Sequence, residues 1–327
     1  MSGDFVRRAS TFRERVANAE PGRYHLYVAL ACPWSHRAVI ARRLLRLERT
    51  ISISYTHPYR DRRGWAFPGG EFSDTAEGFD FLAEAYAATE PAYDGRVSVP
   101  VLWDRRERRI VNNESADIVR IFDELGGGEL YPEPLRPEID ALNELMYDNL
   151  NNGVYRAGFA GSQQAYERAY RDVFATLPEL DRRLATRRYL TGDRIVESDW
   201  RLFVTLVRFD AVYHTHFRLN GARVVDYPNL WGHTRDLYQQ PGVAETVALD
   251  QIKRHYYTTH DSLNPTHVIP LGPERLDFGA PHDRARLGGA EAVHQNGGRA
   301  GAGDPLQAER DRAVADDRGG GEPGRDA

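Results

Sequence analysis

Residues 31–37 read Ala-Cys-Pro-Trp-Ser-His-Arg and join an apolar, strand-like run to an amphipathic, helix-like run. A cysteine at such a turn lies at the start of the helix, where the helix dipole and unpaired backbone N–H groups favour its thiolate. Pro33 suits the first helical position, because its missing N–H would have no intrahelical partner there. The sequence therefore predicts that Cys32 is a nucleophile.

Cys32 is also the only cysteine of the chain. A lone cysteine cannot form an internal disulfide, so redox chemistry at this sulfur needs a second, external thiol. One cysteine also excludes a disulfide framework and a four-cysteine zinc site, and it fits a reducing compartment.

The bulk composition bounds the class of protein. The 327 residues are 41% hydrophobic and 11% aromatic, which is typical of a globular chain, and the net charge of -5 gives no general case for nucleic acid or an anionic membrane as partner. We find no apolar run of the roughly 18 residues that a membrane span needs, and the first residues lack the apolar segment of a secretory signal. We expect a cytoplasmic protein.

The first part of the chain alternates strand-like and helix-like patterns. Their order is β-α-β followed by β-β-α, over residues 24–30, 33–47, 51–55, 97–103, 109–111 and 114–125. This order predicts an α/β, thioredoxin-like domain. Only helical patterns follow, over residues 139–151, 163–187, 199–213 and 230–238, and they predict an all-α domain. Two irregular stretches are expected, at residues 59–79 and 255–271.

These patterns divide the chain into five parts. An N-terminal extension (1–22) precedes the thioredoxin-like domain (23–126), and a linker rich in glycine and proline (127–137) leads to the helical domain with its irregular C-terminal segment (138–287). Residues 288–327 contain hardly any apolar side chains, which predicts a disordered tail.

A thioredoxin-like half followed by an all-helical half resembles the layout of glutathione transferases. The Cys-Pro-Trp-Ser-His-Arg string at 32–37 is similar to the Cys-Pro-Trp-Ala-His-Arg string of one branch, the Xi class or glutathionyl-hydroquinone reductases. Further similar strings lie at residues 60–65, 96–102, 112–115, 152–159, 206–213, 253–257, 264–266 and 276–282. Several strings in order, spread over about residues 5–287, are far more specific than one CxxS motif.

The resemblance implies a two-step reduction of S-glutathionyl-hydroquinones. Cys32 attacks the sulfur of the conjugate, Tyr155 protonates the departing aromatic carbon, and a second glutathione resolves the mixed disulfide. Ser35 stands where a dithiol oxidoreductase would have its resolving cysteine, which is why the second thiol must come from outside. Tyr213 and Tyr256 match two further family tyrosines that face the sulfur and stabilise its thiolate.

Glu114 and Ser115 open a predicted helix. Such a turn offers backbone N–H groups and a hydroxyl to a carboxylate, and the Glu114 side chain can accept from an ammonium, so the pair suits the γ-glutamyl end of glutathione. The Val99-Pro100 pair resembles the cis-proline turn of thioredoxin-like folds. By the same resemblance, the other residues that bind glutathione are Trp65, Arg96, Val97, Ser98 and Val99.

The expected partners are glutathione, as co-substrate, and a glutathionyl-hydroquinone, and the family layout implies a homodimer. Three alternatives stay open: an omega-like thiol transferase or dehydroascorbate reductase, a mycothiol-dependent version of the same reaction, and a non-catalytic binding protein on the same fold. His214 and His216 alternate around Thr215, but a zinc site needs further ligands, and we expect no metal.

One position departs from the superfamily's pattern. A Ser or Thr usually caps the helix that begins before Asp199, and here that position is Val196. The missing side-chain cap is expected to cost about 1 kcal/mol of stability.

Overall fold

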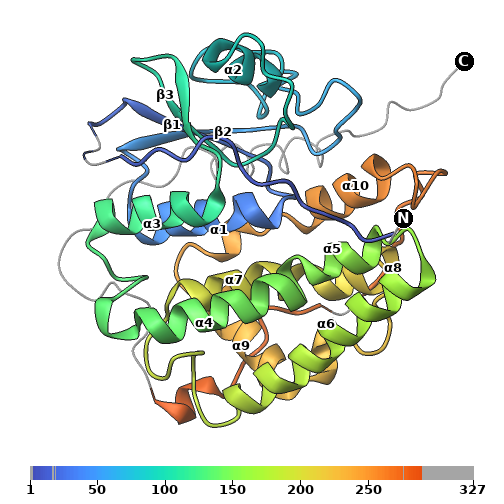
Figure 1. The fold of residues 1–327 in the computed structure, drawn as a ribbon. Coiled ribbons are helices and arrows are strands. Elements are labelled where there is room, and N and C mark those ends of the chain that lie inside the picture. The colour runs from blue at the N-terminus through green and yellow to red at the C-terminus, as the bar shows by residue number, and fades with distance from the viewer. Residues whose placement is uncertain (1–2, 17, 19, 275, 289–327) are drawn as a thin grey trace, which may run out of the picture. The chain divides into compact units, whose positions relative to one another are not determined.

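The computed structural model describes residues 3–16, 18, 20–274 and 276–288. A four-stranded sheet lies at the centre of the first half, in the order β2-β1-β3-β4 (Figure 1). Strand β1 pairs in parallel with β2 and antiparallel with β3, and β3 pairs antiparallel with β4. The strands are β1 (Tyr24–Val28), β2 (Ile51–Tyr55), β3 (Val101–Asp104) and β4 (Arg109–Asn112).

Helices cover both faces of this sheet, with α1 and α3 on one face and α2 on the other (Figure 1). The alternation of side chains along β1 explains the two layers, since Leu26 and Val28 belong to one buried cluster and Tyr27 belongs to the other. The helices of this half are α1 (Pro33–Leu44), α2 (Leu82–Thr89) and α3 (Ser115–Gly126). The predicted β-α-β and β-β-α order is confirmed.

The second half is helical, as predicted. Its elements are α4 (Arg136–Met146), α5 (Gly153–Gly158), α6 (Gln163–Leu184), α7 (Glu197–Arg208), α8 (His214–His216), α9 (Pro228–Tyr238) and α10 (Leu249–Thr259), with short turns at Glu133–Leu135, Val224–Asp226, Ala244–Thr246 and Arg284–Leu287. Helix α7 also packs against the first half, because its Trp200, Phe203 and Val207 share one hydrophobic cluster with residues of α1 and α3.

The helices predicted over 139–151 and 199–213 are helical to their predicted ends, and each finishes in a π-helical turn, Tyr147–Asn151 and Phe209–Tyr213. One expectation was wrong: residues 255–259, expected to be irregular, form the last part of α10. The buried side chains at 255–257 are a histidine and two tyrosines. Because these are not aliphatic residues, the buried face of the helix is not recognisable in the sequence.

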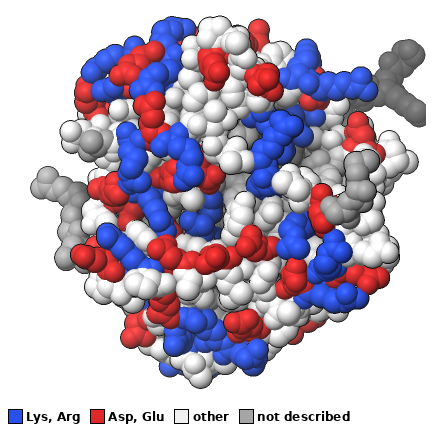
Figure 2. Space-filling model, viewed as in Figure 1, with Lys and Arg blue, Asp and Glu red and all other residues white. Residues whose placement is uncertain are grey.

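The short helices α2 and α5 were not predicted either; with eight and six residues, they are too short for a periodic signal. The tail predicted to be disordered lies, apart from Gly288, outside the described residues. Within the described part, no helix is long and apolar enough to cross a membrane. Lys and Arg side chains intermix with Asp and Glu over the face drawn in Figure 2.

Candidate active site

Cys32 lies at the start of α1, as its sequence context predicts. It is the N-cap residue, with extended backbone angles (φ -80°, ψ 122°), Pro33 follows in the first turn, and the Cys32 carbonyl accepts the first helical hydrogen bond from His36 N at 2.9 Å. Its Sγ lies 3.8 Å from the carbonyl oxygen of Val99, and the Val99–Pro100 bond is cis. The half-buried thiol therefore faces the turn that the resemblance assigned to glutathione.

Ser35 occupies the position of a resolving cysteine but points into the protein. Its side chain is fully buried, and its hydroxyl accepts a hydrogen bond of 3.4 Å from the backbone N–H of Ala29. A hydroxyl held in this way offers no second sulfur to a mixed disulfide. The arrangement agrees with a thiol that depends on an external partner.

The turn before Cys32 is held by a side chain from the helical half. The buried guanidinium of Arg208 donates to the carbonyl oxygens of Leu30 (2.7 Å) and Ala31 (3.0 Å). It also donates to His36 Nδ1 at 2.9 Å, so the opposite ring nitrogen carries the hydrogen and donates to Thr246 at 2.8 Å. Burial, and then the Arg208 charge, hold the pKa of His36 well below its usual range, so this imidazole is neutral.

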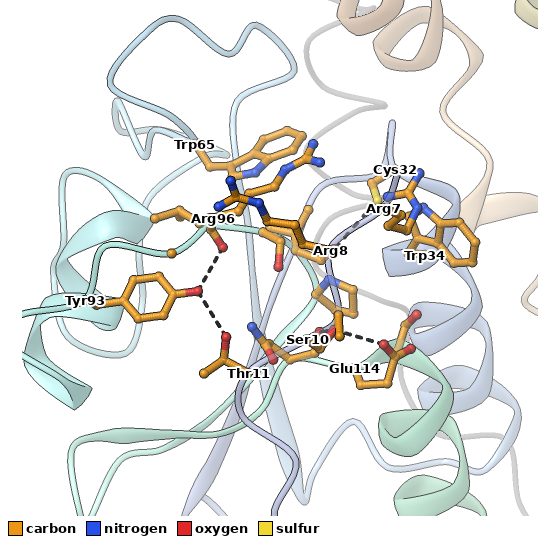
Figure 3. A pocket seen from close by; sticks show the side chains of 18 of the residues that line it. Arg7, Arg8, Ser10, Thr11, Cys32, Trp34, Trp65, Tyr93, Arg96 and Glu114 are labelled. Atoms are coloured by element: carbon orange, nitrogen blue, oxygen red, sulfur yellow. Dashed lines mark hydrogen bonds between the residues drawn. The ribbon is translucent and has the colours of Figure 1, made fainter. Parts of the chain in front are cut away.

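A cavity of about 340 Å³ opens beside the thiol and is called here the first pocket (Figure 3). All seven residues predicted to bind glutathione line it, together with Cys32 itself: Trp65, Arg96, Val97, Ser98, Val99, Glu114 and Ser115. They come from the loop after β2, the segment before β3 and the start of α3. The fold thus brings three separate stretches of sequence to one pocket.

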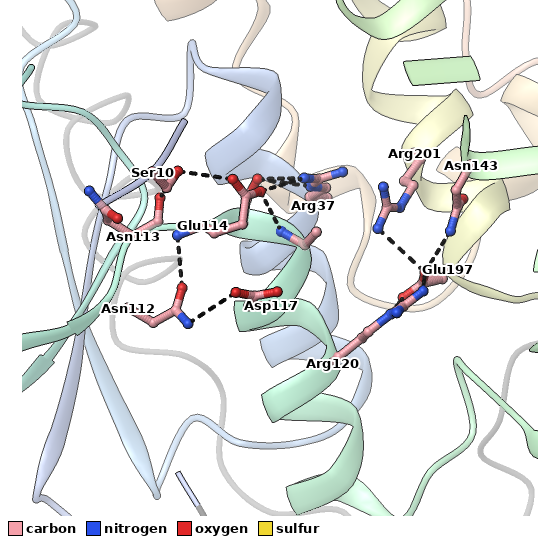
Figure 4. Close-up of polar contacts among 12 residues, drawn as sticks. Ser10, Arg37, Asn112, Asn113, Glu114, Asp117, Arg120, Asn143, Glu197 and Arg201 are labelled. Carbon is pink, nitrogen blue, oxygen red and sulfur yellow. Dashed lines mark hydrogen bonds and ion pairs between the residues drawn. The ribbon is translucent and has the colours of Figure 1, made fainter. Parts of the chain in front are cut away.

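Glu114 is fixed in a network of polar contacts at the N-terminus of α3 (Figure 4). Its carboxylate accepts from the backbone N–H of Ala116 at 3.1 Å and from the hydroxyl of Ser10 at 2.9 Å. Arg37 donates to the Ser115 hydroxyl at 2.6 Å and lies 3.6 Å from the Glu114 carboxylate. Burial, aided by repulsion from Arg201, lowers the pKa of Arg37 to about 9. The Glu114 carboxylate remains partly exposed to the pocket, where it can accept from an ammonium.

The first pocket also contains residues that sequence reasoning missed. The segment treated as an extension contributes Arg7, Arg8, Ser10 and Thr11, and other walls come from Trp34, Tyr93, Asn113 and Tyr147. Figure 3 shows this N-terminal segment crossing in front of Cys32. The local sequence pattern does not predict that this segment lies at the pocket, because the segment has almost no periodic structure and reaches the site through long-range contacts.

A second pocket, also of about 340 Å³, meets the first at the sulfur. The two share Arg7, Cys32, Trp34, Trp65 and Arg96. The second pocket adds side chains from the N-terminus, the loop after β2, α5 and the end of α10: Phe5, Arg60, Tyr155, Phe159, His255, Tyr256, Thr259, His260, Asp261 and Ser262. Cys32 therefore borders two pockets of similar volume, and the second is lined by many aromatic side chains.

Three tyrosine hydroxyls form a chain beside the second pocket. Tyr256 lies 2.5 Å from Tyr155 and 3.2 Å from Tyr213, oxygen to oxygen. Tyr155 and Tyr256 line the pocket, whereas the fully buried Tyr213 lines neither pocket and reaches the second one only through Tyr256. Burial raises the pKa of all three hydroxyls, so they hold their protons at neutral pH.

The histidines of the second pocket are neutral. The ring of His255 stacks on Trp65 with centroids 5.1 Å apart, its Nδ1 lies 2.7 Å from the Pro58 carbonyl, and burial lowers its pKa to about 4. His260 pairs with His216 at 3.1 Å, and burial lowers the pKa of His260 to about 2. Among the described residues, no group of three or more His, Cys, Asp or Glu side chains is placed to hold a metal ion.

This geometry suits thiol exchange on an aromatic thioether. A thiol at a helix start lies between a pocket with peptide-binding groups and a pocket with protonated hydroxyls. A sulfur atom bonded to both a peptide and a ring would bridge the two pockets at Cys32.

Comparison with known proteins points the same way. Family models described as the N-terminal and C-terminal domains of glutathione S-transferase match residues 31–125 and 163–236. The chain is 49% identical over 282 residues to the glutathionyl-hydroquinone reductase PcpF of Sphingobium chlorophenolicum, covering 83% of this chain and 90% of that protein. It is 47% identical over 304 residues to the glutathionyl-hydroquinone reductase YqjG of Escherichia coli, covering 86% and 92%.

Solved structures agree with these relatives. A Xi class transferase from Natrialba magadii matches with a TM-score of 0.84 and 47% identity, over 88% of this chain and 94% of that one. The glutathione-bound structure of YqjG from Escherichia coli matches with a TM-score of 0.79 and 49% identity, over 81% of this chain and 89% of that one.

Proposed function

This chain belongs to the Xi class of the glutathione S-transferase family, and from that premise we propose that it reduces S-glutathionyl-hydroquinones to hydroquinones with glutathione. The observation that carries the proposal is the meeting of two pockets at the single thiol, Cys32. The names of the relatives supply the substrate class, and the two pockets supply room for its two parts.

In the first step the Cys32 thiolate attacks the sulfur of the conjugate. A disulfide bond forms between Cys32 and glutathione, and the bond from that sulfur to the ring carbon breaks. The electron pair of the broken bond stays with the ring carbon, which takes a proton from the Tyr155 hydroxyl and leaves as hydroquinone. The ring is reduced, and the two sulfur atoms are oxidised to a mixed disulfide.

In the second step the thiolate of another glutathione attacks the glutathionyl sulfur of the mixed disulfide. Oxidised glutathione leaves, Cys32 returns to its thiolate, and the proton of the incoming thiol replaces the one that Tyr155 gave up. Since Ser35 offers no internal sulfur, this external attack is the route that regenerates the enzyme.

The tyrosine chain supports the role of Tyr155. A proton donor must still hold its proton when substrate arrives, and burial raises the pKa of Tyr155 well above its usual range. Once that proton has gone, the hydrogen bond from Tyr256 at 2.5 Å stabilises the phenolate that remains. Tyr213 in turn contacts Tyr256 and orients its hydroxyl.

The first pocket supports glutathione as the thiol. Glu114 and Ser115 suit the γ-glutamyl ammonium and carboxylate, and the segment from Arg96 to Val99 lies along the opposite wall. We extend the proposal to a homodimer in a reducing, cytoplasmic compartment, on the family resemblance and the single free thiol. Analytical ultracentrifugation tests the dimer.

The test of the function is turnover of a synthetic S-glutathionyl-hydroquinone, followed as release of hydroquinone and oxidised glutathione in equal amounts. Mass spectrometry after incubation with conjugate alone should find one glutathione attached to the chain, and the Cys32→Ser variant should show neither adduct nor turnover. Retained reduction by Cys32→Ser would overturn the mechanism. The same assay with dehydroascorbate and with a mycothiol conjugate tests the alternative substrates, and absence of all turnover would favour a binding protein.

A further inference from the structure

Arg60 lines the second pocket and has no carboxylate partner among the described residues. Within the part of the chain that the structure describes, its guanidinium donates no hydrogen bond and forms no ion pair, and its Nε is fully buried. The group packs against the ring of Trp65, 5.3 Å from the centroid, while the backbone N–H of Arg60 donates to the Thr259 hydroxyl at 3.3 Å. Arg60 is therefore held in place by packing and backbone contacts, with its donors free.

Two more guanidinium groups lie nearby. Arg7 and Arg96 line both pockets, and no described carboxylate pairs with either of them (Figure 3). Burial, and then repulsion from Arg96, lower the pKa of Arg60, whereas the Cys32 thiolate raises it. Among the described residues, the only carboxylate that lines the second pocket belongs to Asp261, which is 77% exposed and pairs with His267 at 2.8 Å. The described residues that line the second pocket thus include three guanidinium groups, and a bound anion would reduce the repulsion among them.

The charged groups of a bound glutathione would pair with only some of these arginines. It brings two carboxylates and one ammonium; the γ-glutamyl end suits Glu114 and Ser115, and the glycine carboxylate suits Arg96 and Arg8, which line the first pocket. Arg60 lines the second pocket alone, on the side of the aromatic ring. The neutral imidazoles there add no charge, so Arg60, like Arg7 at the border of the two pockets, is left without a described carboxylate.

We propose that the preferred substrates are conjugates whose hydroquinone ring carries a carboxylate, and that Arg60 binds this group. The inference rests on the proposed function and names its substrate class. A guanidinium matches a carboxylate with two parallel hydrogen bonds, which a neutral ring substituent cannot replace. Because Arg60 is partly buried, such a pair discriminates more strongly there than it would at a fully exposed site.

The test compares two conjugates that differ only in charge. One is the glutathionyl conjugate of a dihydroxybenzoate, and the other is that of the corresponding dihydroxybenzamide, with the sulfur on the same ring carbon. Because the two differ in intrinsic reactivity, the readout is the ratio of their kcat/KM values. We expect Arg60→Gln to lower the ratio, carboxylate over carboxamide, by about tenfold, and Arg60→Lys to keep part of it.

The matched control is Arg62→Gln, the same exchange at an exposed arginine that lines neither pocket. It should keep the ratio of the wild type. A ratio that is equal in the wild type and Arg60→Gln would overturn the inference.

A second measurement needs no variant. The free dihydroxybenzoate should inhibit the wild type about tenfold more strongly than the dihydroxybenzamide when glutathione is bound, and equal inhibition would also overturn the inference. If the wild type turned over neither conjugate, the proposed function would fail instead, and the two failures are therefore distinguishable.

Discussion

Tyr155 lies at the pocket end of a chain of hydroxyls that burial keeps protonated. Its oxygen contacts Tyr256 at 2.5 Å, and Tyr256 contacts Tyr213 at 3.2 Å. Tyr155 and Tyr256 both line the second pocket, and we assign the donated proton to Tyr155, whose phenolate the Tyr256 hydroxyl can stabilise. At the residue scale, the proposed proton transfer therefore depends on one oxygen atom.

Replacing Tyr155 by Phe removes this oxygen and little volume. We expect kcat for conjugate reduction to fall by about 100-fold, because a positioned general acid contributes at least that much, while the KM for glutathione changes little. Steady-state kinetics measure both constants. Tyr170→Phe is the control, since Tyr170 in α6 packs on Phe174 and lines neither pocket. A kcat for Tyr155→Phe within twofold of the control would contradict the assignment.

At the scale of elements, the start of α7 has half of a capping arrangement. Asp199 accepts from the backbone N–H of Val196 at 3.0 Å and also from Leu190 N and His233 Nε2, both at 2.9 Å. The Val196 side chain makes no capping hydrogen bond, as expected from the sequence. Helix α7 bridges the two halves of the chain, so its missing cap weakens an element on which the active site depends.

Val196→Thr should restore the cap. Thr has nearly the shape of the buried Val, and its hydroxyl can accept from the backbone N–H of Asp199, so we expect the free energy of unfolding to rise by about 1 kcal/mol. Val196→Ala removes volume without adding a cap and should lower the same quantity by about 2 kcal/mol. Urea unfolding measures both changes, and a loss of stability in the Thr variant would show that the hydroxyl finds no partner.

At the scale of the whole molecule, one buried side chain ties the helical half to the nucleophile. Arg208, at the end of α7, donates to the two carbonyls that precede Cys32. The loop between β1 and α1 is therefore shaped by contacts from a residue more than 170 positions away in sequence.

Arg208→Lys keeps the charge but loses the fork that reaches both carbonyls. We expect the free energy of unfolding to fall by about 2 kcal/mol, because buried acceptors lose a charged donor, and we expect kcat to fall more than KM rises. The control is Arg218→Lys, where the guanidinium donates to one partly buried carbonyl, that of Gly158 at 2.8 Å. Unfolding and kinetics like those of the control would argue against a positioning role for Arg208.

Buried histidines make the stability of the whole molecule depend on pH. Burial lowers the pKa values of His25, His216 and His255 to about 4, so the folded state binds fewer protons than the unfolded state below about pH 6.5. Stability is therefore full at neutral pH and decreases as the pH falls from about 6.5 toward 4. For the fully buried His255, whose pKa is lowered from 6.5 to about 4, the cost is about 2 kcal/mol at pH 5.

The His255→Asn variant isolates one of these contributions. Asn can still donate toward the Pro58 carbonyl but does not titrate, so the loss of stability between pH 7 and pH 5 should shrink by about 2 kcal/mol. Urea unfolding at the two pH values measures the difference, with His57→Asn as the matched exchange outside both pockets. An unchanged difference would mean that His255 becomes protonated without unfolding the protein.

Much of the fold followed from local patterns. The extents of β2 and the start of α6 agree with their predicted ranges, because alternation and capping act between near neighbours. The seven predicted glutathione residues lie on the first pocket, because the resemblance identified them within specific strings. The missed residues Arg7 and Arg8 belong to a segment without periodic structure, where a sequence pattern carries no record of distant contacts, whereas Arg60 lies in a string that the resemblance included without giving this residue a role.

The sequence by itself determined the chemistry available at Cys32: a thiol at a helix start, with no second cysteine to resolve its disulfides. These properties depend on residue identity and on neighbours within one turn. Only the tertiary structure decided which pockets meet at that sulfur, which hydroxyls stay protonated there, and which arginines line those pockets without a described carboxylate partner. Burial and charge pairing depend on side chains far apart in the chain, and they exist only once the two halves have packed together.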